Sequence, residues 1–155
     1  MGKGYAGDRK DMVNSDTVKL LQECDAGTKM AVTAINEVLE NVRDTDMKQL
    51  LQESRRHHEK LGDEIHSLLI SHGTAEKDPT LLAKGMSWMK TNMKLSMDNS
   101  DAAVADLITD GCNMGVKSLN KSLNQYRMAD HKSKDIGEKL ISIEEKLCGD
   151  LEKYL

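Results

Sequence analysis

The chain has 155 residues, a net charge of −4, a single proline, 3% aromatic residues and no phenylalanine. This length suits one domain, and the scarcity of aromatic residues argues against an all-β fold. No basic block stands out and no apolar stretch approaches the roughly 20 residues of a membrane span, so neither nucleic acid nor a membrane is an expected partner.

The first 14 residues are polar and glycine-rich, and we expect them to form a flexible N-terminal tail. Residues 15–155 are expected to form a single domain. A first helix is predicted to begin at Ser15 or Asp16, because both are good N-caps. A short turn at 43–46 follows, in which Asp46 can cap a second helix. So short a turn predicts an antiparallel pair.

Buried-type side chains recur every three or four residues along both helices, as expected of packed helix faces. In the first helix this seam is Leu21, Cys24, Thr28, Ala31, Ile35, Val38 and Val42. In the second helix it is Met47, Leu51, Ser54, His58, Leu61, Ile65 and Leu68.

The second helix is predicted to end near Gly73, a plausible residue just past a helix C-terminus. Pro79 suits the first position of a new helix. Residues 80–97 are too long for a plain loop, and we interpret them as a crossover helix. Its methionine-rich face and its tryptophan form a possible partner surface of Met86, Trp88, Met89, Met93 and Met97.

A cap cluster at 98–101 precedes the third helix, which is predicted to run to about Arg127. A turn at 128–130 leads into the last helix. Gly111 and Gly115 form a small-residue pair that indicates close approach of another helix. The two seams are Ile108, Cys112, Val116, Leu119, Leu123 and Tyr126, and then Ile136, Leu140, Ile143, Leu147, Leu151 and Tyr154.

The chain carries an internal repeat. Residues 26–43 match residues 110–127 at an offset of 84, and residues 59–61 match 145–147 at an offset of 86. A repeat of this length indicates two copies of one supersecondary unit. Two duplicated hairpins joined by a long crossover between the second and third helices predict an all-α four-helix bundle.

This layout resembles the ferritin and rubrerythrin superfamily. The strongest local resemblance is the segment 53–61, which looks like the second-helix metal motif of ferritins. On this overlay His57 lies at the family's ligand histidine, whereas Ser54 lies where its bridging glutamate should be. The resemblance implies a ferritin-like bundle with a carboxylate-bridged metal pair, for which the candidate ligands are Asp25, Glu53, His57, His58, Asp110, Glu144 and Glu145.

The fourth helix weakens the case for a standard di-iron centre. Such a centre needs about six inward ligands. Glu144 and Glu145 flank the seam residue Ile143, and no histidine follows them. The sequence therefore favours a bundle without a cofactor, with iron or manganese as the alternative.

A nearer resemblance, over residues 15–154, is to an uncharacterised bacterial family of ferritin-like domains. It is carried by Arg55 or Arg56 near the middle of the second helix. The second feature is the basic segment 84–90, which contains Gly85 and Trp88. This resemblance implies no established activity, because function depends on a site and not on a fold.

Three functions stay open. The sequence favours a protein without catalytic activity, which forms a homo-oligomer or binds a protein partner through the crossover helix. The alternative is a divergent di-iron-type protein in iron handling or oxidative stress. The third is a buried ligand pocket near Thr28, Ser54, His58 and Gly111. The three cysteines, which form no Cys-x-x-Cys pair, are interpreted as reduced core residues of a cytoplasmic protein.

Overall fold

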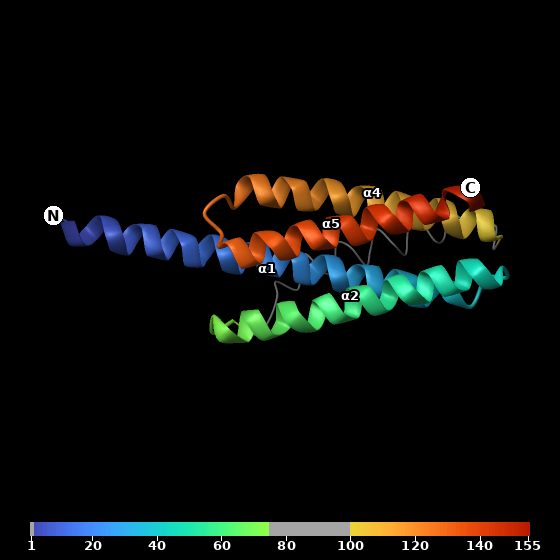
Figure 1. Cartoon of the computed structure of the whole chain (residues 1–155), viewed down its shortest axis with the longest axis horizontal. Helices are drawn as coiled ribbons and strands as arrows, with labels where there is room; N and C mark the ends of the chain where they lie inside the picture. The colour runs from blue at the N-terminus through green and yellow to red at the C-terminus, as the bar shows by residue number, and fades with distance from the viewer. Residues whose placement is uncertain (1, 75–99) are drawn as a thin grey trace.

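The computed structural model describes residues 2–74 and 100–155, with side chains from Asp8 onward. The described residues form four long helices and a short 3-10 helix: α1 (Gly2–Leu39), α2 (Thr45–Ser71), α4 (Asp101–Gln125), α5 (His131–Leu151) and η1 (Glu152–Tyr154). α1 and α2 form one antiparallel hairpin, α4 and α5 form the second, and the hairpins lie side by side (Figure 1). The predicted all-α four-helix bundle is confirmed. The crossover at 80–97, with Met86, Trp88, Met89, Met93 and Met97, lies outside the described residues.

α1 begins at Gly2, and its first turns project beyond the other helices (Figure 1). The predicted start at Ser15 or Asp16 is therefore wrong. The Asp16 carboxylate instead accepts a hydrogen bond of 2.8 Å from the Met128 N–H, which fastens α1 to the turn between α4 and α5. The predicted flexibility of residues 1–14 stays a prediction.

Short polar side chains cap the other helices. Asp44, and not the expected Asp46, caps α2 by accepting a hydrogen bond of 2.8 Å from the Met47 N–H. Asp130 caps α5 in the same way. Gly73 has a φ of 75° just after the last turn of α2, as predicted for a residue that ends a helix in the left-handed region.

Asp101 ties the two hairpins together at one end of the bundle. Its carboxylate accepts hydrogen bonds from the Arg43 N–H at 2.8 Å and the Asp44 N–H at 2.9 Å.

We expect Asp101→Ala to lower the free energy of unfolding by about 1 kcal/mol. A charged acceptor strengthens both hydrogen bonds, whereas their exposure to water weakens them. Urea denaturation measures the change, with Asp106→Ala at an exposed position of α4 as the control. Equal effects of the two substitutions would contradict this role.

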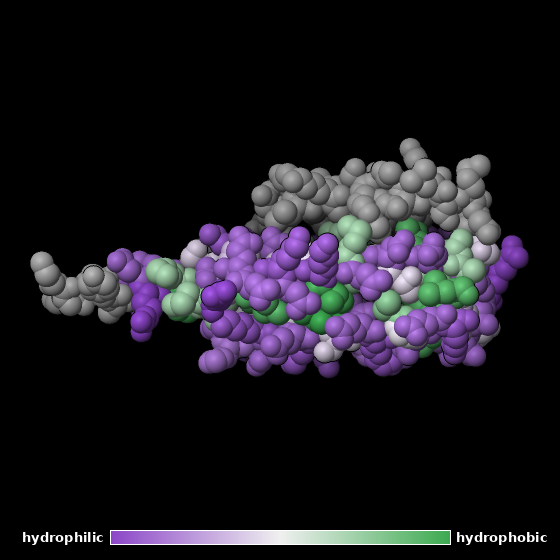
Figure 2. Space-filling model, turned by 90° about the horizontal axis from the view of Figure 1, so that it is seen from above, coloured by the Kyte–Doolittle hydropathy of each residue, from purple (hydrophilic) through white to green (hydrophobic). Residues whose placement is uncertain are grey.

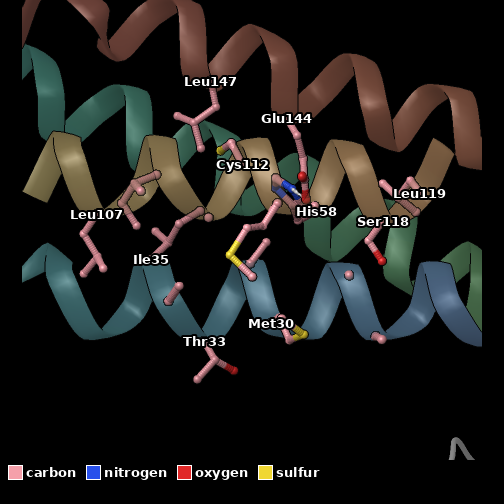
Figure 3. A pocket seen from close by; sticks show the side chains of 18 of the residues that line it. Met30, Thr33, Ile35, His58, Leu107, Cys112, Ser118, Leu119, Glu144 and Leu147 are labelled. Atoms are coloured by element: carbon pink, nitrogen blue, oxygen red, sulfur yellow. Dashed lines mark ion pairs between the residues drawn. The ribbon is translucent and has the colours of Figure 1, made fainter. Parts of the chain in front are cut away.

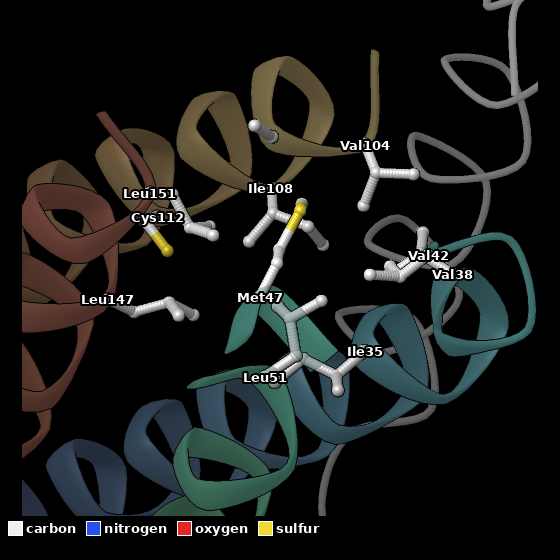
Figure 4. Packing of buried hydrophobic residues seen from close by; sticks show 11 residues of the cluster. Ile35, Val38, Val42, Met47, Leu51, Val104, Ile108, Cys112, Leu147 and Leu151 are labelled. Carbon is white, nitrogen blue, oxygen red and sulfur yellow. The ribbon is translucent and has the colours of Figure 1, made fainter. Parts of the chain in front are cut away.

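The buried apolar side chains form two clusters, one toward each end of the bundle. The cluster near the α1–α2 turn is shown in Figure 4 and contains Ile35, Val38, Val42, Met47, Leu51, Val104, Ala105, Ile108, Cys112, Leu147 and Leu151. The other contains Leu20, Leu21, Cys24, Leu61, Ile65, Leu69, Leu119, Ala129, Ile136 and Leu140. Between the two clusters, His58 on α2 and Glu144 on α5 occupy buried positions.

The buried positions of the two hairpins follow the offsets of the sequence repeat. Six buried residues of α2 coincide with buried residues of α5 at an offset of 86: Met47 with Ser133, Leu51 with Gly137, Ser54 with Leu140, His58 with Glu144, Leu61 with Leu147 and Ile65 with Leu151. His58 and Glu144 are thus equivalent positions that face each other across the bundle.

Three positions of the predicted seams are wrong by one residue. Leu68, Leu123 and Ile143 are only half-buried, whereas their neighbours Leu69, Ser122 and Glu144 are buried. The reason in α5 is helical phase: positions 140, 144, 147 and 151 share one face, whatever the polarity of the side chain at 144.

Hydrophilic side chains cover most of the face shown in Figure 2, and hydrophobic ones form separate patches along it. Among the described helices, none combines the length and the apolar character that a membrane span requires. The apolar residues of the described chain are concentrated between the helices. His58 and Glu144 are a polar pair buried among them.

Candidate functional site

The side chains of His58 and Glu144 point toward each other from α2 and α5 (Figure 3). His58 Nε2 lies 3.8 Å from Glu144 Oε1, and the side chains are only 1% and 6% exposed. This distance is beyond that of a hydrogen bond. The two side chains are therefore neighbours in the core, but a gap remains between their polar atoms.

The orientation of His58 is fixed from within α2. Its Nδ1 lies 2.8 Å from the backbone carbonyl oxygen of Ser54. Because a carbonyl oxygen can only accept, Nδ1 carries a hydrogen and donates it. This leaves Nε2 as the ring atom directed at Glu144. The partner of Nδ1 is thus a backbone group one turn earlier, which no substitution of a side chain removes.

Glu144 owes its place to a glycine on α4. A Cβ atom added at Gly115 would lie 2.9 Å from Glu144 Cδ and still closer to Oε2. Burial raises the pKa of the Glu144 carboxyl, and the nearby His58 opposes this shift. Among the described residues, neither Glu144 Oε2 nor His58 Nε2 has a hydrogen-bond partner.

A cavity of about 270 Å³ adjoins the pair (Figure 3). α1 and α4 supply most of its walls, which are mainly apolar. Small residues at positions matched by the repeat, Gly27 with Gly111 and Ala31 with Gly115, leave much of the space. The small-residue pair on α4 was expected to allow close helix approach, but here it borders a cavity. Of the residues expected near a pocket, His58 and Gly111 line it, whereas Thr28 and Ser54 do not.

Two solved structures share this arrangement of helices. The crystal structure of Dps92 from Deinococcus radiodurans superposes with a TM-score of 0.72 at 15% identity, over 92% of this chain and 87% of that chain. The bacterioferritin-related protein from Bacteroides fragilis, described as a dodecameric thioferritin, gives a TM-score of 0.72 at 12% identity, over 98% of this chain and 92% of that one. The chain has a ferritin-like fold. No protein-family model and no curated protein matches the sequence.

The described core of this ferritin-like bundle does not supply the ligands of a carboxylate-bridged metal pair. Among the described residues, no group of three or more histidine, cysteine, aspartate or glutamate side chains is placed to hold a metal ion. Asp25 is buried, but its Oδ2 lies 2.9 Å from Lys29 Nζ. The exposed candidates are Glu53, His57, Asp110 and Glu145. Of the candidate ligands, His58 and Glu144 are the two that the structure brings together in the core, 3.8 Å apart.

The three cysteines differ in burial, and all are free thiols. Burial raises the pKa of Cys24 to about 12 and raises that of Cys112 still further, with Glu144 adding to the shift at Cys112. Cys148 is half-buried.

Because the thiolate is the reactive species, we expect Ellman's reagent to modify Cys148 at least tenfold faster than Cys24 or Cys112 in the folded protein. A fast phase that persists in Cys148→Ser would contradict this.

Proposed function

We propose that this ferritin-like bundle is a non-catalytic binding protein that holds a small molecule in the cavity beside His58 and Glu144. The observation that carries the proposal is a mainly apolar cavity of about 270 Å³ that adjoins a buried polar pair. Ligand sites combine apolar walls with a few polar groups that fix orientation. The volume is close to the lower end of the usual range for such sites, which indicates a small ligand.

The test uses two cyclic probes, toluene and cyclohexanol, and the unfolding temperature as the readout. A ligand that binds only the folded state raises this temperature in a saturable way. We expect at least one probe to raise the unfolding temperature of the unmodified protein and of the control Ala102→Leu, which is at an exposed position of α4. Neither probe should raise the unfolding temperature of Ala31→Leu, in which the larger side chain fills the cavity. No shift of the unmodified protein with either probe would refute the proposal.

A divalent cation is a second candidate for the same place. Imidazole nitrogen and carboxylate oxygen are both metal ligands, and one of each is unpartnered here among the described residues. Elemental analysis after anaerobic incubation with Fe(II), Mn(II) or Zn(II), on protein purified without an affinity tag, decides between the candidates. Two iron or manganese ions per chain, lost in His58→Ala, would favour a divergent metalloprotein in iron handling. We expect no stoichiometric metal.

Self-association is a further part of the proposal. Support comes from the fold shared with a protein described as dodecameric. Light scattering coupled to size-exclusion chromatography is expected to give the mass of an oligomer, that is, of more than one chain of 17.3 kDa. A monomer at all concentrations would contradict this part and leave the ligand site untouched. The prediction that the crossover helix forms the contact stays a prediction.

A further inference from the structure

The polar pair of the core lacks a group that would complete its hydrogen bonds. His58 Nε2 and Glu144 Oε2 have no partner among the described residues, and the gap from Nε2 to Oε1 is 3.8 Å. The large majority of buried side-chain polar atoms in proteins are hydrogen-bonded. Both unpartnered side chains line the cavity. A bound molecule is therefore the natural source of the missing partner.

The chemistry of that partner depends on which of the two residues holds a proton. If Glu144 is ionised and His58 protonated, Nε2 donates and the carboxylate accepts. If both are neutral, Nε2 accepts and the carboxyl O–H donates. In either arrangement the pair presents one donor and one acceptor. A hydroxyl group, which both donates and accepts, satisfies the pair in either arrangement.

Other polar groups fit less well. An ammonium group can only donate, so it is satisfied only when His58 Nε2 and the Glu144 carboxyl are both deprotonated. A carboxylate can only accept, and it would place a second negative charge beside Glu144. Either ion would also be moved from water into a mainly apolar cavity at a large cost in solvation. The pair and its surroundings together favour a neutral ligand.

The cavity sets the size of the rest of the ligand. An apolar cavity of about 150 Å³ is known to hold benzene. The cavity here has about 270 Å³, room for a hydrocarbon body somewhat larger than one six-membered ring. Its apolar surroundings include Met30 and Ile35 on α1 and Leu107 on α4 (Figure 3).

We propose that the cavity binds a small neutral alcohol or phenol, whose hydroxyl group bridges His58 and Glu144 while its hydrocarbon body lies between α1 and α4. This inference rests on the proposed binding function and names the ligand class of that site. The ligand's hydrocarbon supplies most of the contact area, and its hydroxyl supplies selectivity. Such a site discriminates against an analogue without the hydroxyl, because that analogue leaves two buried polar atoms unpaired.

Matched probes test the inference by isothermal titration calorimetry on the full chain. Cyclohexanol is compared with methylcyclohexane, and phenol with toluene, since each pair differs only by a hydroxyl in place of a methyl. We expect each hydroxyl compound to bind about tenfold to a hundredfold more tightly than its methyl counterpart. This preference should disappear in the double variant His58→Leu/Glu144→Leu and persist in Glu145→Leu, an exposed position on the same helix.

The contrary outcomes separate the inference from the function on which it rests. Equal affinities within each pair of probes would overturn the hydroxyl bridge, since water would then satisfy the polar pair in both complexes. Tighter binding of cyclohexylamine than of cyclohexanol would overturn it in favour of a cation. A complete failure of all the probes to bind the unmodified protein would refute the proposed function as well.

Discussion

Replacing His58 alone by leucine is expected to lower the free energy of unfolding by about 3 kcal/mol, whereas replacing His58 and Glu144 together should restore at least the original stability. The single change leaves a buried carboxyl without the imidazole that opposes the effect of its burial. The double change removes both unpartnered atoms and fills their space with apolar groups. It would also join the two apolar clusters that the pair now separates.

Urea denaturation of the four proteins of a double-mutant cycle measures this expectation. The coupling free energy is the difference between the double variant and the sum of the two single ones. Glu145→Leu is the control, because substitutions at an exposed position usually change stability by about 0.5 kcal/mol or less. Strictly additive single effects would show that the pair does not interact. A double variant more stable than the natural sequence, yet unable to bind cyclohexanol, would indicate that the pair is kept for a ligand.

The helices could be predicted from the sequence because buried-type side chains recur every three or four residues along it. Seam residues such as Leu51, Ile65 and Leu140 have the spacing of one helix face, and all are fully buried. Helix ends were predicted less well. Asp46 and Asp44 are chemically equal as caps, and only the path of the turn, fixed by Asp101, selects Asp44.

The buried position of Glu144 was obscured by its polarity, which favoured the neighbouring Ile143 as the seam residue. The sequence nevertheless contained a signal that could have found the pair. The offset of 86 that aligns residues 59–61 with 145–147 also aligns His58 with Glu144. Applied to the whole helix, this register predicts that two polar side chains face each other in the core.

A pocket near His58 and Gly111 was expected from the sequence, but its walls and volume could not be predicted, because they depend on the distance between α1 and α4. The glycines at 27 and 111 were visible as matched small residues, which is typical of closely packed helices. The same residues border an open space when the backbones stay apart. Hydropathy also gives no information on hydrogen bonds such as that from His58 Nδ1 to the Ser54 carbonyl, which decides the direction of Nε2.

Glu144→Gln is expected to stabilise the protein by about 2 kcal/mol near pH 8, and this gain should shrink as the pH falls toward 4.5. Burial raises the pKa of Glu144 above its ordinary value of 4.5 in the folded state. The folded chain thus holds this proton at pH values where the unfolded chain has released it. Stability then falls as the pH rises through the raised pKa, and glutamine removes this loss because it does not ionise.

Urea denaturation between pH 4.5 and pH 8 follows the difference between the two proteins. Glu145→Gln is the matched control, because it removes a carboxylate from the same helix at an exposed position.

The groups that face Glu144 are His58 on α2 and Cys112 on α4, and Glu23 on α1 lines the same cavity. All three are present in both variants, so a change in the difference with pH reports on position 144 and its interaction with these groups. A stability difference that stays constant with pH would mean that Glu144 titrates alike in the folded and unfolded chains. A gain that grows toward acid would mean that the folded state favours the carboxylate, so that the ion pair with His58 outweighs the cost of burial.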